Sequence, residues 1–427
     1  MDSGLSTRMS TALQELIPKL KAVAPHDLYD PTTAIDLSCA QNEMLREELI
    51  EFLKTTVEKK TSKKVFELPD ANGGDVVLRN ALASFFNTYF KPIHAVSPEH
   101  IVITAGASDA IENLIHAVCD EGDSVIVPGP YWYGLDTILK GRANVNIVVA
   151  HPPTYRNYDN YLLPSLQAAY DFSADRSRIK AVLICNPSNP LSRCYPKKSL
   201  VECMEFCQER GLHLISDELY ALTGLKGAPD DAPPFVSALS LTEPLVPSGA
   251  VKVDPSRVHM VWSASKLFGS SGFRVGCLIS QQNPQLLAAT SLTTTDHVSS
   301  IASLYLSSLL AWSQLPTLLA LNSERLSDSY RLLAAALRQW KVDFILPTHG
   351  LFLFAKLAKD SKTARDETAF FDRLAMQGIR VGHGQWYRGV EGDFGWARIR
   401  FSVDVDVMMR ALSVFSTFLK SEGFAIS

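Results

Sequence analysis

The sequence predicts an α/β protein in which helices cover both faces of a mainly parallel sheet. The first observation is a set of six short, apolar, β-branched runs, typical of fully buried strands: Ile101–Thr104, Ser124–Val127, Val145–Val149, Ala181–Cys185, Leu212–Ser216 and Val258–Ser263. The second is that stretches with a helical pattern, such as Asp109–Val118 and Lys197–Arg210, lie between these runs. Alternating strands and helices favour parallel pairing, because each helix carries the chain back to the start of the next strand.

The third observation is length. At 427 residues the chain exceeds the ~250–300 residues at which a single core stops growing, so two lobes with a cleft between them are expected. From about Ile301 the pattern changes to a long amphipathic helix, Ile301–Leu337, followed by shorter strands near Gly350–Leu357 and Ala397–Val403. We interpret this part as the second lobe. The segment Gly224–Asp254 is rich in Pro, Ser, Gly and Asp and is predicted to be a surface excursion between two core strands.

Composition and charge exclude several classes of protein. A chain that is 46% hydrophobic and 20% charged is typical of a globular protein, and a net charge of −4 gives no field that would attract nucleic acid or an anionic membrane. The basic stretch Lys59–Lys64 is interpreted as a solvated helix end or loop. No apolar run reaches the ~20 residues of a membrane span, and residues 1–10 lack the layout of a signal peptide. Seven cysteines without a C-x-x-C pair or zinc spacing predict no metal site and a reducing, cytoplasmic compartment.

Candidate ligand-binding residues follow the predicted strands directly. In parallel sheets ligands bind in the crevice at the carboxyl ends of the strands. Gly106–Asp109 (GASD) follows the first run and opens a helix, whose exposed backbone N–H groups suit a phosphate. The same residue types also cap helices for structural reasons alone.

Three further motifs carry aromatic or polar side chains to the same edge. Pro128–Tyr133 (PGPYWY) places aromatic rings where a flat heterocycle could stack, and Asn189 of Asn186–Pro190 (NPSNP) can donate to a ring oxygen. Asp217 ends the fifth run, where a buried carboxylate needs a partner charge. Ordinary packing, a turn and a helix cap are the respective structural alternatives.

The strongest signal is Lys266, which follows the last run in Ser263–Lys266 (SASK). A lysine at the buried end of a strand is costly as a free ammonium, so it calls for an ion pair or for conversion to an imine. Two neighbouring hydroxyls and Arg274, in the GFRVG motif that follows, supply donors for a phosphate.

Five motifs occur in the order GAS, PYWYG, NPSNPL, DELY and SASK-x5-GFRVG. Together they resemble the motifs of the fold-type I enzymes that use pyridoxal 5′-phosphate (PLP), which form the aspartate aminotransferase superfamily of class I/II. The resemblance extends over nearly the whole chain. Within it the chain is most similar to 1-aminocyclopropane-1-carboxylate (ACC) synthases and their fungal relatives, through Leu37–Glu43 (LSCAQNE), Asn186–Arg193 (NPSNPLSR) and Gly395–Ser402 (GWARIRFS). The resemblance implies a three-layer α/β/α large domain at 46–300 with a mostly parallel seven-stranded sheet. It also implies a smaller α+β domain formed by 1–45 and 301–427, a homodimer, and a small substrate of amino-acid type.

The resemblance also implies a role for each motif residue. Lys266 is implied to hold the cofactor as a Schiff base and then to move the substrate's α-proton, while Asp217 pairs with the pyridine nitrogen. Asn189 and Tyr220 are implied to hydrogen-bond the 3-oxygen of the ring, and Tyr131 to stack on its face. The remaining implied contacts are to the phosphate, and they come from Ala107, Ser108, Ser263, Ser265 and Arg274.

Substrate contacts are less determined. An α-carboxylate calls for a bidentate arginine. The family's pattern of Arg, aliphatic, any, Phe and a small residue selects Arg398, with Arg400 on the same strand face as second candidate. ACC synthases have Glu where this chain has Gln41, and a Tyr from the neighbouring subunit where it has Ala71; Asn72 is the polar side chain left beside that position.

These departures remove groups that would handle S-adenosylmethionine, so ACC synthesis itself is disfavoured. One reading is an ACC synthase-like enzyme that removes the α-proton and then eliminates or replaces a β- or γ-substituent, for example by C–S cleavage. The second is an aminotransferase that forms a 2-oxo acid. The third, a PLP-binding regulator without turnover, is disfavoured because residues 1–40 are too short and insufficiently basic for a DNA-binding domain.

Overall fold

The largest sheet confirms the predicted fold class. The computed structural model describes residues 4–23, 34–68, 72–156, 158–241, 253–294 and 296–424. The sheet has seven strands, in the spatial order β2 (Ile101–Thr104), β8 (Gly276–Ile279), β7 (Val258–Ser263), β6 (His213–Asp217), β5 (Ile179–Cys185), β3 (Ser124–Pro128) and β4 (Asn146–Ala150). Strand β8 pairs antiparallel with both of its neighbours, and the other four pairings are parallel. The six predicted runs are therefore all strands of one mostly parallel sheet.

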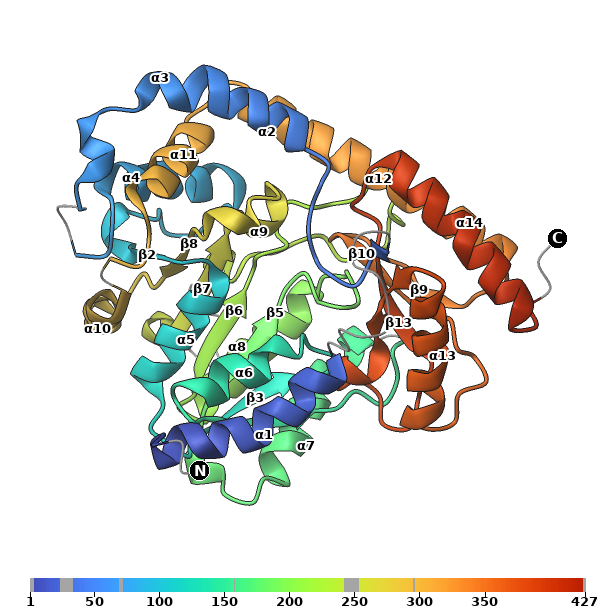
Figure 1. Ribbon diagram of the computed structural model, residues 1–427. Helices are drawn as coiled ribbons and strands as arrows, with labels where there is room; N and C mark the ends of the chain where they lie inside the picture. The colour runs from blue at the N-terminus through green and yellow to red at the C-terminus, as the bar shows by residue number, and fades with distance from the viewer. Residues whose placement is uncertain are drawn as a thin grey trace.

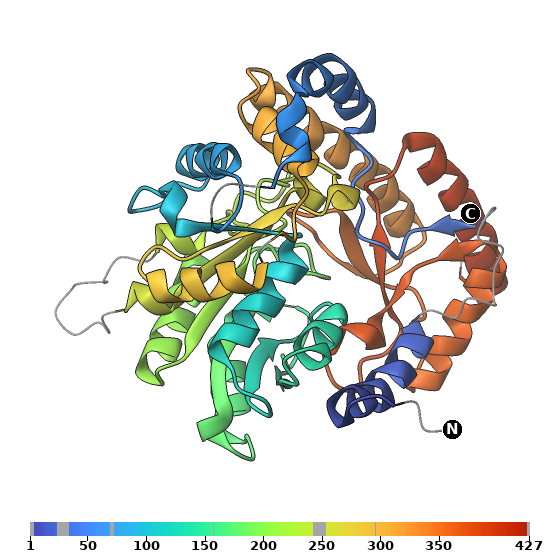
Figure 2. The same ribbon diagram turned by 60° about the vertical axis from the view of Figure 1, so that its left-hand side comes forward.

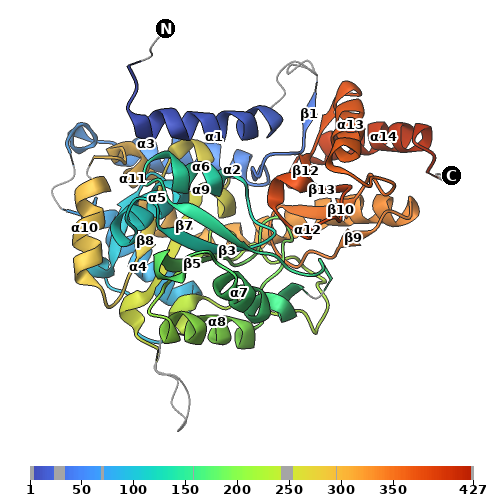
Figure 3. The ribbon, with the colours of Figure 1, turned by 90° about the horizontal axis from the view of Figure 1, so that it is seen from below.

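Helices lie on both faces of this sheet. On β3, Val125 and Val127 pack in a core cluster with one set of helices, whereas Ile126 between them packs in the cluster of the opposite face, as the alternation of a strand requires. Figure 3 shows the sheet between these two layers. The first layer holds α5 (Ala107–Val118) and α6 (Gly134–Gly141), and the second holds α7 (Leu162–Asp171) and α8 (Lys197–Glu209).

A third core cluster covers the β2, β8 and β7 part of the sheet. Buried residues of these strands pack there against α2 (Arg46–Phe52), α4 (Val76–Tyr89) and α11 (Ser300–Leu310). In Figure 1 these helices lie together above the strands. The remaining helical segments that the structure assigns before α11 are α1 (Thr7–Val23), η1 (Leu53–Val57), α3 (Glu58–Lys60), η2 (Lys63–Phe66), α9 (Ala264–Leu267) and α10 (Pro284–Thr294), besides short 3₁₀ turns. Lys59–Lys64 is exposed at the end of α3 and in the following turn.

The prediction of one continuous helix over Ile301–Leu337 is wrong. The chain forms α11 and then α12 (Leu315–Gln339), with a break between them and Pro316 in the first turn of α12. Proline has no N–H to donate and fits the first turn of a helix, so a new helix begins there. Of the helices in the described part of the chain, none alone has the length and hydropathy of a membrane span, and α11 and α12 meet that test only as a pair bent by 91°.

The second lobe contains a four-stranded antiparallel sheet and a two-stranded parallel one. The first has the order β12 (Gly382–His383), β13 (Trp396–Arg400), β10 (Phe352–Lys356) and β9 (Phe344–Ile345), and the second pairs β1 (Ile35–Asp36) with β11 (Ile379–Arg380). Helices α13 (Ala364–Met376) and α14 (Val405–Ser421) pack with β10, β13 and the later part of α12 in one core cluster. Strand β1 joins this lobe although it lies near the start of the chain (Figure 2). The division into 46–300 and 1–45 with 301–427 stays a prediction.

Candidate active site

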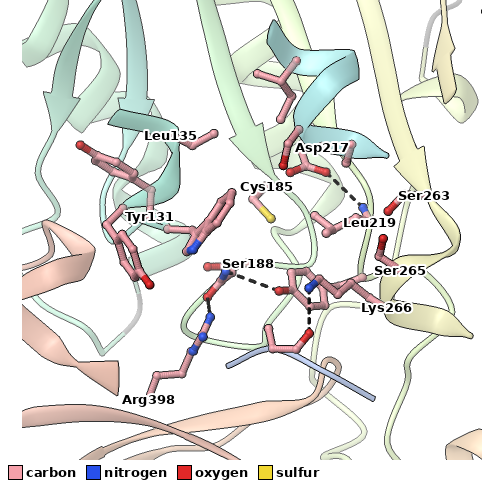
Figure 4. A pocket seen from close by; sticks show the side chains of 18 of the residues that line it. Tyr131, Leu135, Cys185, Ser188, Asp217, Leu219, Ser263, Ser265, Lys266 and Arg398 are labelled. Atoms are coloured by element: carbon pink, nitrogen blue, oxygen red, sulfur yellow. Dashed lines mark hydrogen bonds between the residues drawn. The ribbon is translucent and has the colours of Figure 1, made fainter. Parts of the chain in front are cut away.

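A cavity of about 440 Å³ lies at the carboxyl ends of β3, β5, β6 and β7. Its opposite wall is formed by residues 38–40 and by Arg380 and Arg398 of the second lobe. Figure 4 shows the side chains of the sheet edge and Arg398 around this space. The structure therefore brings together side chains that are up to about 360 residues apart in the sequence.

Lys266 lies in the four-residue helix α9, which begins directly after β7. Its Nζ donates a hydrogen bond to the backbone oxygen of Ala40 at 2.7 Å. Burial lowers the pKa of Lys266 to about 8, and the positive charge of Arg398 acts in the same direction. A larger share of the amine is consequently neutral near pH 8 than for an ordinary lysine, which suits attack on an aldehyde and proton transfer.

Asp217 ends β6 and is 8% exposed. Its Oδ1 accepts a hydrogen bond from the backbone N–H of Leu219 at 3.3 Å, and no salt bridge joins it to a cation among the described residues. Burial raises its pKa to about 7. The charge of Lys266 acts to lower this pKa but does not offset burial. The carboxyl group therefore fits the protonated nitrogen of a pyridine ring, whose charge would compensate the cost of burial.

Donors for an anion converge at the start of α5. Gly106, with a φ of +91°, precedes the helix, and a Cβ there would lie 2.8 Å from Nη2 of Arg274. Arg274 donates to the backbone oxygens of Ala105 at 2.7 Å and Ser271 at 2.9 Å, so its guanidinium group is held beside the helix terminus. The hydroxyl of Ser263 is buried and has no hydrogen-bond partner. Together these groups fit a phosphate.

The other predicted phosphate contacts also border the cavity. Ala107, Ser108 and Ser265 are among its lining residues. Ser271, to which the motifs assigned no role, lines it too and donates from its hydroxyl to the backbone oxygen of Ser265 at 3.0 Å. Its position in the Ser270–Ser271 pair directly before GFRVG is the signal that could have identified it.

The aromatic wall differs from the expectation in one respect. Tyr131 lines the cavity, but its hydroxyl donates to Asp136 at 3.4 Å, and Figure 4 places its ring well apart from Lys266 and Asp217. The next residue, Trp132, also lines the cavity and is less buried. Its indole lies where a side chain on Gly134 would be, since a Cβ there would fall 2.2 Å from Cζ2 of Trp132. Trp132 is therefore a second candidate for stacking on a flat ligand, and Gly134 is the sequence signal for it.

Asn189, Tyr220 and Arg398 form one hydrogen-bonded chain. Asn189 donates to the hydroxyl of Tyr220 at 3.4 Å, and its oxygen accepts from Nη1 of Arg398 at 2.8 Å. Nη2 of Arg398 donates to the backbone oxygen of Ser38, while its guanidinium carbon lies 4.5 Å from the ring centroid of Phe352. Arg398 is 3% exposed and borders the cavity, so it is in place to hold a carboxylate.

Arg400, in contrast, does not border the cavity. Its Nη1 forms an ion pair with Glu43 at 2.8 Å and its Nη2 donates to the backbone oxygen of Asp36 at 2.8 Å. It faces the same side of β13 as Arg398 but lies two residues further along, roughly 7 Å away, beyond the cavity. The ion pair with Glu43 favours Arg398 over Arg400 as the carboxylate clamp, and the choice stays a prediction.

The two substrate-side positions Gln41 and Asn72 do not border the cavity within one chain. The side chain of Gln41 is exposed, and its backbone oxygen accepts from Ser402. Asn72 is exposed ahead of α4. That either residue contacts the substrate stays a prediction, and within one chain neither borders the cavity. Asp70 and Ala71 lie outside the described residues.

Several lining residues were given no individual role from the sequence, among them Cys39, Tyr133, Cys185 and Arg380. Cys185 ends β5 opposite Asp217 in the parallel register, so its place follows from the strand pairing. Cys39 and Arg380 lie on segments that meet through the pairing of β1 with β11, which nothing local in the sequence indicates.

Comparisons with known proteins find relatives over nearly the whole chain. A family model for aminotransferases of class I and II matches residues 33–415. The probable aminotransferase aclI of Aspergillus oryzae is 35% identical over 421 residues, covering 98% of this chain and 98% of that protein. ACC synthase 1 of Oryza sativa subsp. indica is 33% identical over 346 residues, covering 79% and 69%. A solved aspartate aminotransferase of Thermus thermophilus matches in fold with a TM-score of 0.72, at 20% identity, over 97% of this chain and 99% of that one.

Proposed function

The chain belongs to the class I and II aminotransferases, and from this membership we propose that it cleaves a bond to a β- or γ-substituent of an L-amino acid, with C–S cleavage as the leading case. Pyridoxal phosphate is the cofactor of the family and of this chain. The observation that carries the proposal is that one cavity presents two separate proton-handling side chains, Lys266 and Tyr133.

The cofactor contacts divide among the residues described above. Arg274, Ser263 and the start of α5 would hold the phosphate, and Asp217 would keep the ring nitrogen protonated. Asn189 and Tyr220 would hold the 3-oxygen, and Tyr131 or Trp132 would cover a ring face. When bound, PLP supplies an electron sink for the charge that develops at the substrate's α-carbon.

The protein's own groups then account for the proton transfers. Nζ of Lys266 removes the α-proton while Arg398 holds the α-carboxylate. As the bond from the β-carbon to sulfur breaks, sulfur leaves with the electron pair, and the hydroxyl of Tyr133 donates a proton to it. Overall a cysteine S-conjugate and one water give a thiol, ammonia and a 2-oxo acid, so no oxidant or reductant is needed.

Tyr133 suits this task because of its surroundings. It is half-buried, and burial raises the pKa of its hydroxyl, while the charges of Arg398 and Arg380 act to lower it. A phenol close to guanidinium groups can release a proton to a leaving thiolate and is stabilised as the phenolate until it is reprotonated. Transamination requires proton transfer at Lys266 alone, and a second proton donor has no part in it.

The aminotransferase reading stays as the second candidate, favoured by the names of the fungal relatives. Both aclI and the 34% identical sirI of Leptosphaeria maculans are called probable aminotransferases. The ACC synthase relative favours bond cleavage at the substituent. Its product, 1-aminocyclopropane-1-carboxylate, keeps the amino group on the α-carbon, whereas an aminotransferase removes that group.

Product analysis separates the two candidates. The holoenzyme is incubated with S-benzyl-L-cysteine, with and without 2-oxoglutarate, and thiol, ammonia and cofactor absorbance are followed. We expect release of thiol and ammonia even when no 2-oxoglutarate is added. In Tyr133→Phe, thiol release should decrease roughly 10²-fold while the cofactor spectrum is unchanged. Conversion of the cofactor to its amine form, reversed by 2-oxoglutarate and without thiol, would establish the aminotransferase instead.

A homodimer and a cytoplasmic location are further proposals. Phe66, Leu68 and Val77 are 90%, 71% and 61% exposed on either side of Asn72, and exposed apolar residues of this kind are typical of subunit interfaces. The seven cysteines are all free, which suits a reducing compartment. Light scattering should give the mass of two chains, and the mass of one chain would contradict the dimer.

A further inference from the structure

The arginine proposed to bind the α-carboxylate is in contact with two aromatic rings. The guanidinium carbon of Arg398 lies 4.5 Å from the ring centroid of Phe352 and 5.2 Å from that of Tyr387. Both aromatic side chains are buried, and neither borders the cavity. A guanidinium group within about 6 Å of a ring centroid is attracted by the ring, most strongly where water is excluded. The two rings can therefore influence a ligand only through Arg398.

Hydrogen bonds to the protein hold the guanidinium group of Arg398 only in part. Nη1 donates to Oδ1 of Asn189 and Nη2 to the backbone oxygen of Ser38, whereas Nε is buried and has no hydrogen-bond partner among the described residues. Each Nη has a second N–H that can serve a ligand. A two-pronged contact requires the carboxylate to lie in the plane of the guanidinium fork. A ring in contact with this planar group restricts its rotation out of that plane.

A glycine beside Arg398 makes room for the ring of Tyr387. Gly382 is the cross-strand partner of Arg398 in the pair of β12 and β13, and a Cβ there would lie 2.3 Å from the hydroxyl oxygen of Tyr387. A larger residue at position 382 would thus require the tyrosine ring to move. The backbone oxygen of Tyr387 accepts from the backbone N–H of Tyr131 at 2.7 Å, so the backbone is held independently of the ring.

The hydroxyl of Tyr387 does not explain why a tyrosine is placed here. It is buried and has no hydrogen-bond partner among the described residues, and such a hydroxyl costs free energy. The ring has two neighbours of interest, Arg398 and the ring of Tyr133, whose centroid lies 6.3 Å away in an edge-to-face arrangement. A test of Tyr387 must therefore separate an effect on Arg398 from an effect on Tyr133.

We propose that Tyr387 is a positioning residue, whose ring, together with that of Phe352, holds the guanidinium group of Arg398 in the orientation that receives an α-carboxylate. The inference rests on the proposed function for one point, the assignment of Arg398 as the carboxylate clamp. It applies equally to bond cleavage and to transamination, because the substrate of either reaction is an α-amino acid.

The test measures binding without turnover. One probe is α-methyl-S-benzyl-L-cysteine, which has no α-proton to lose, and the other is the amine in which a methyl group replaces its carboxylate. The dissociation constant of each probe is obtained by titrating the cofactor absorbance of the holoenzyme, which responds to the amino group that both probes share. Wild-type protein should bind the carboxylate probe more tightly, and the ratio of the two dissociation constants measures the contribution of the carboxylate.

Tyr387→Leu removes the ring but keeps a large apolar side chain. Its affinity for the carboxylate probe should fall roughly 3- to 30-fold, the range expected for a contact between a cation and a ring, while its affinity for the amine should hardly change. Tyr387→Phe keeps the ring and should retain the wild-type ratio. An equal loss for both probes in Tyr387→Leu would overturn the inference, because it would show that the ring acts on Tyr133 or on packing. A changed ratio in Tyr387→Phe would overturn it too.

Tyr155 provides the matched control. It is 4% exposed, belongs to the same core cluster as Tyr387, and packs edge-to-face on Phe354 and Trp396. Among the described residues it is not one of the rings that lie over Arg398. Tyr155→Leu should lower the melting temperature and leave the ratio of dissociation constants unchanged. A fall in this ratio as large as that in Tyr387→Leu would overturn a specific role for Tyr387.

A double-mutant cycle with Arg398→Gln tests the same coupling directly. Removal of the guanidinium group should weaken binding of the carboxylate probe, and the addition of Tyr387→Leu should then have no further effect on that binding. Additive losses would overturn the inference, because Tyr387 would then act independently of Arg398.

Failure of the proposed function gives a different result. Absence of thiol release in the product analysis would contradict C–S cleavage, and the titrations would still support or overturn the role of Tyr387. If Arg398→Gln left the ratio of dissociation constants unchanged, the clamp assignment and the inference would both be overturned. If Arg398→Gln lowered the ratio and Tyr387→Leu did not, the inference alone would fail.

Discussion

The two ends of the cavity are built in different ways. The cofactor end is formed by residues at or just beyond the ends of strands of one sheet, such as Asp217 at the end of β6 and Lys266 after β7. The substrate end combines residues 38–40, Arg380 and Arg398, which meet only through the sheets of the second lobe. The first end depends on a local strand-to-loop geometry, and the second on long-range pairing.

This difference suggests that the cofactor end is shared among related enzymes, whereas the substrate end determines which substrate is bound. Groups fixed at strand ends keep one geometry as long as the sheet forms, and so they suit a cofactor that does not change. Groups from a separate lobe can differ without disturbing the sheet, and so they suit selection among substrates. Mutations at the two ends should accordingly differ in what they change.

The largest effect is expected at the cofactor end. Lys266→Ala removes the amine that joins the cofactor and moves the α-proton, and activity should fall by at least ~10⁴-fold. The visible absorbance of the lysine–cofactor linkage should disappear in the same variant, whereas the circular dichroism spectrum should not change. Persistence of that absorbance band would show that another residue holds the cofactor.

A smaller effect confined to the substrate end is expected from Arg398→Lys. Lysine cannot reproduce the two-pronged contact with a carboxylate, so KM for the amino acid should rise roughly 10- to 100-fold, with the cofactor absorbance retained. The matched variant is Arg400→Lys, whose guanidinium group pairs with Glu43 outside the cavity. It should lower the melting temperature and leave KM nearly unchanged. The reverse pattern would show that Arg400 is the clamp.

The smallest expected effect is on the pH dependence of cofactor uptake, in which Arg398 at the substrate end influences Lys266 at the cofactor end. Only the neutral amine of Lys266 can react with the cofactor aldehyde, and its pKa is lowered to about 8. The rate at which apoprotein takes up PLP should therefore rise ~10-fold for each pH unit below 8 and level off above it. Because the charge of Arg398 contributes to the lowered pKa, Arg398→Gln should move this midpoint to higher pH. A wild-type midpoint near that of an ordinary lysine, 10.5, would contradict the effect of burial.

The same contrast explains what the sequence could predict. Buried strands are visible as apolar runs, and a polar residue that follows one directly is placed at the sheet edge, which was sufficient to bring Asp217, Asn189 and Lys266 together. Strand β8 was not predicted, because four residues before a polar turn give little pattern. The break before Pro316 was missed because leucine and alanine continue on both sides of it.

The substrate end was only partly predictable for a physical reason. Arg398 and Arg400 have the same residue type, the same strand and the same face, and the partner Glu43 that distinguishes them is about 360 residues away. Arg380 lies in a two-residue strand, and its pairing with β1 leaves no periodic signal. Tyr131 and Trp132 are neighbours in the sequence and both line the cavity, so the motif alone does not select the ring that covers a flat ligand.

The pairing of β1 with β11 also sets an order of events during synthesis on the ribosome. Leu37 emerges early, yet its backbone partners belong to Arg380 and Arg400 near the other end of the chain. At the ~5–20 residues per second of translation, the early strand waits roughly 20 to 70 s for them. The sheet that holds the cofactor is complete in the nascent chain by Ile279, long before the substrate wall can close. A chain that stalls between these points would carry Lys266 without Arg380 and Arg398 across the cavity from it.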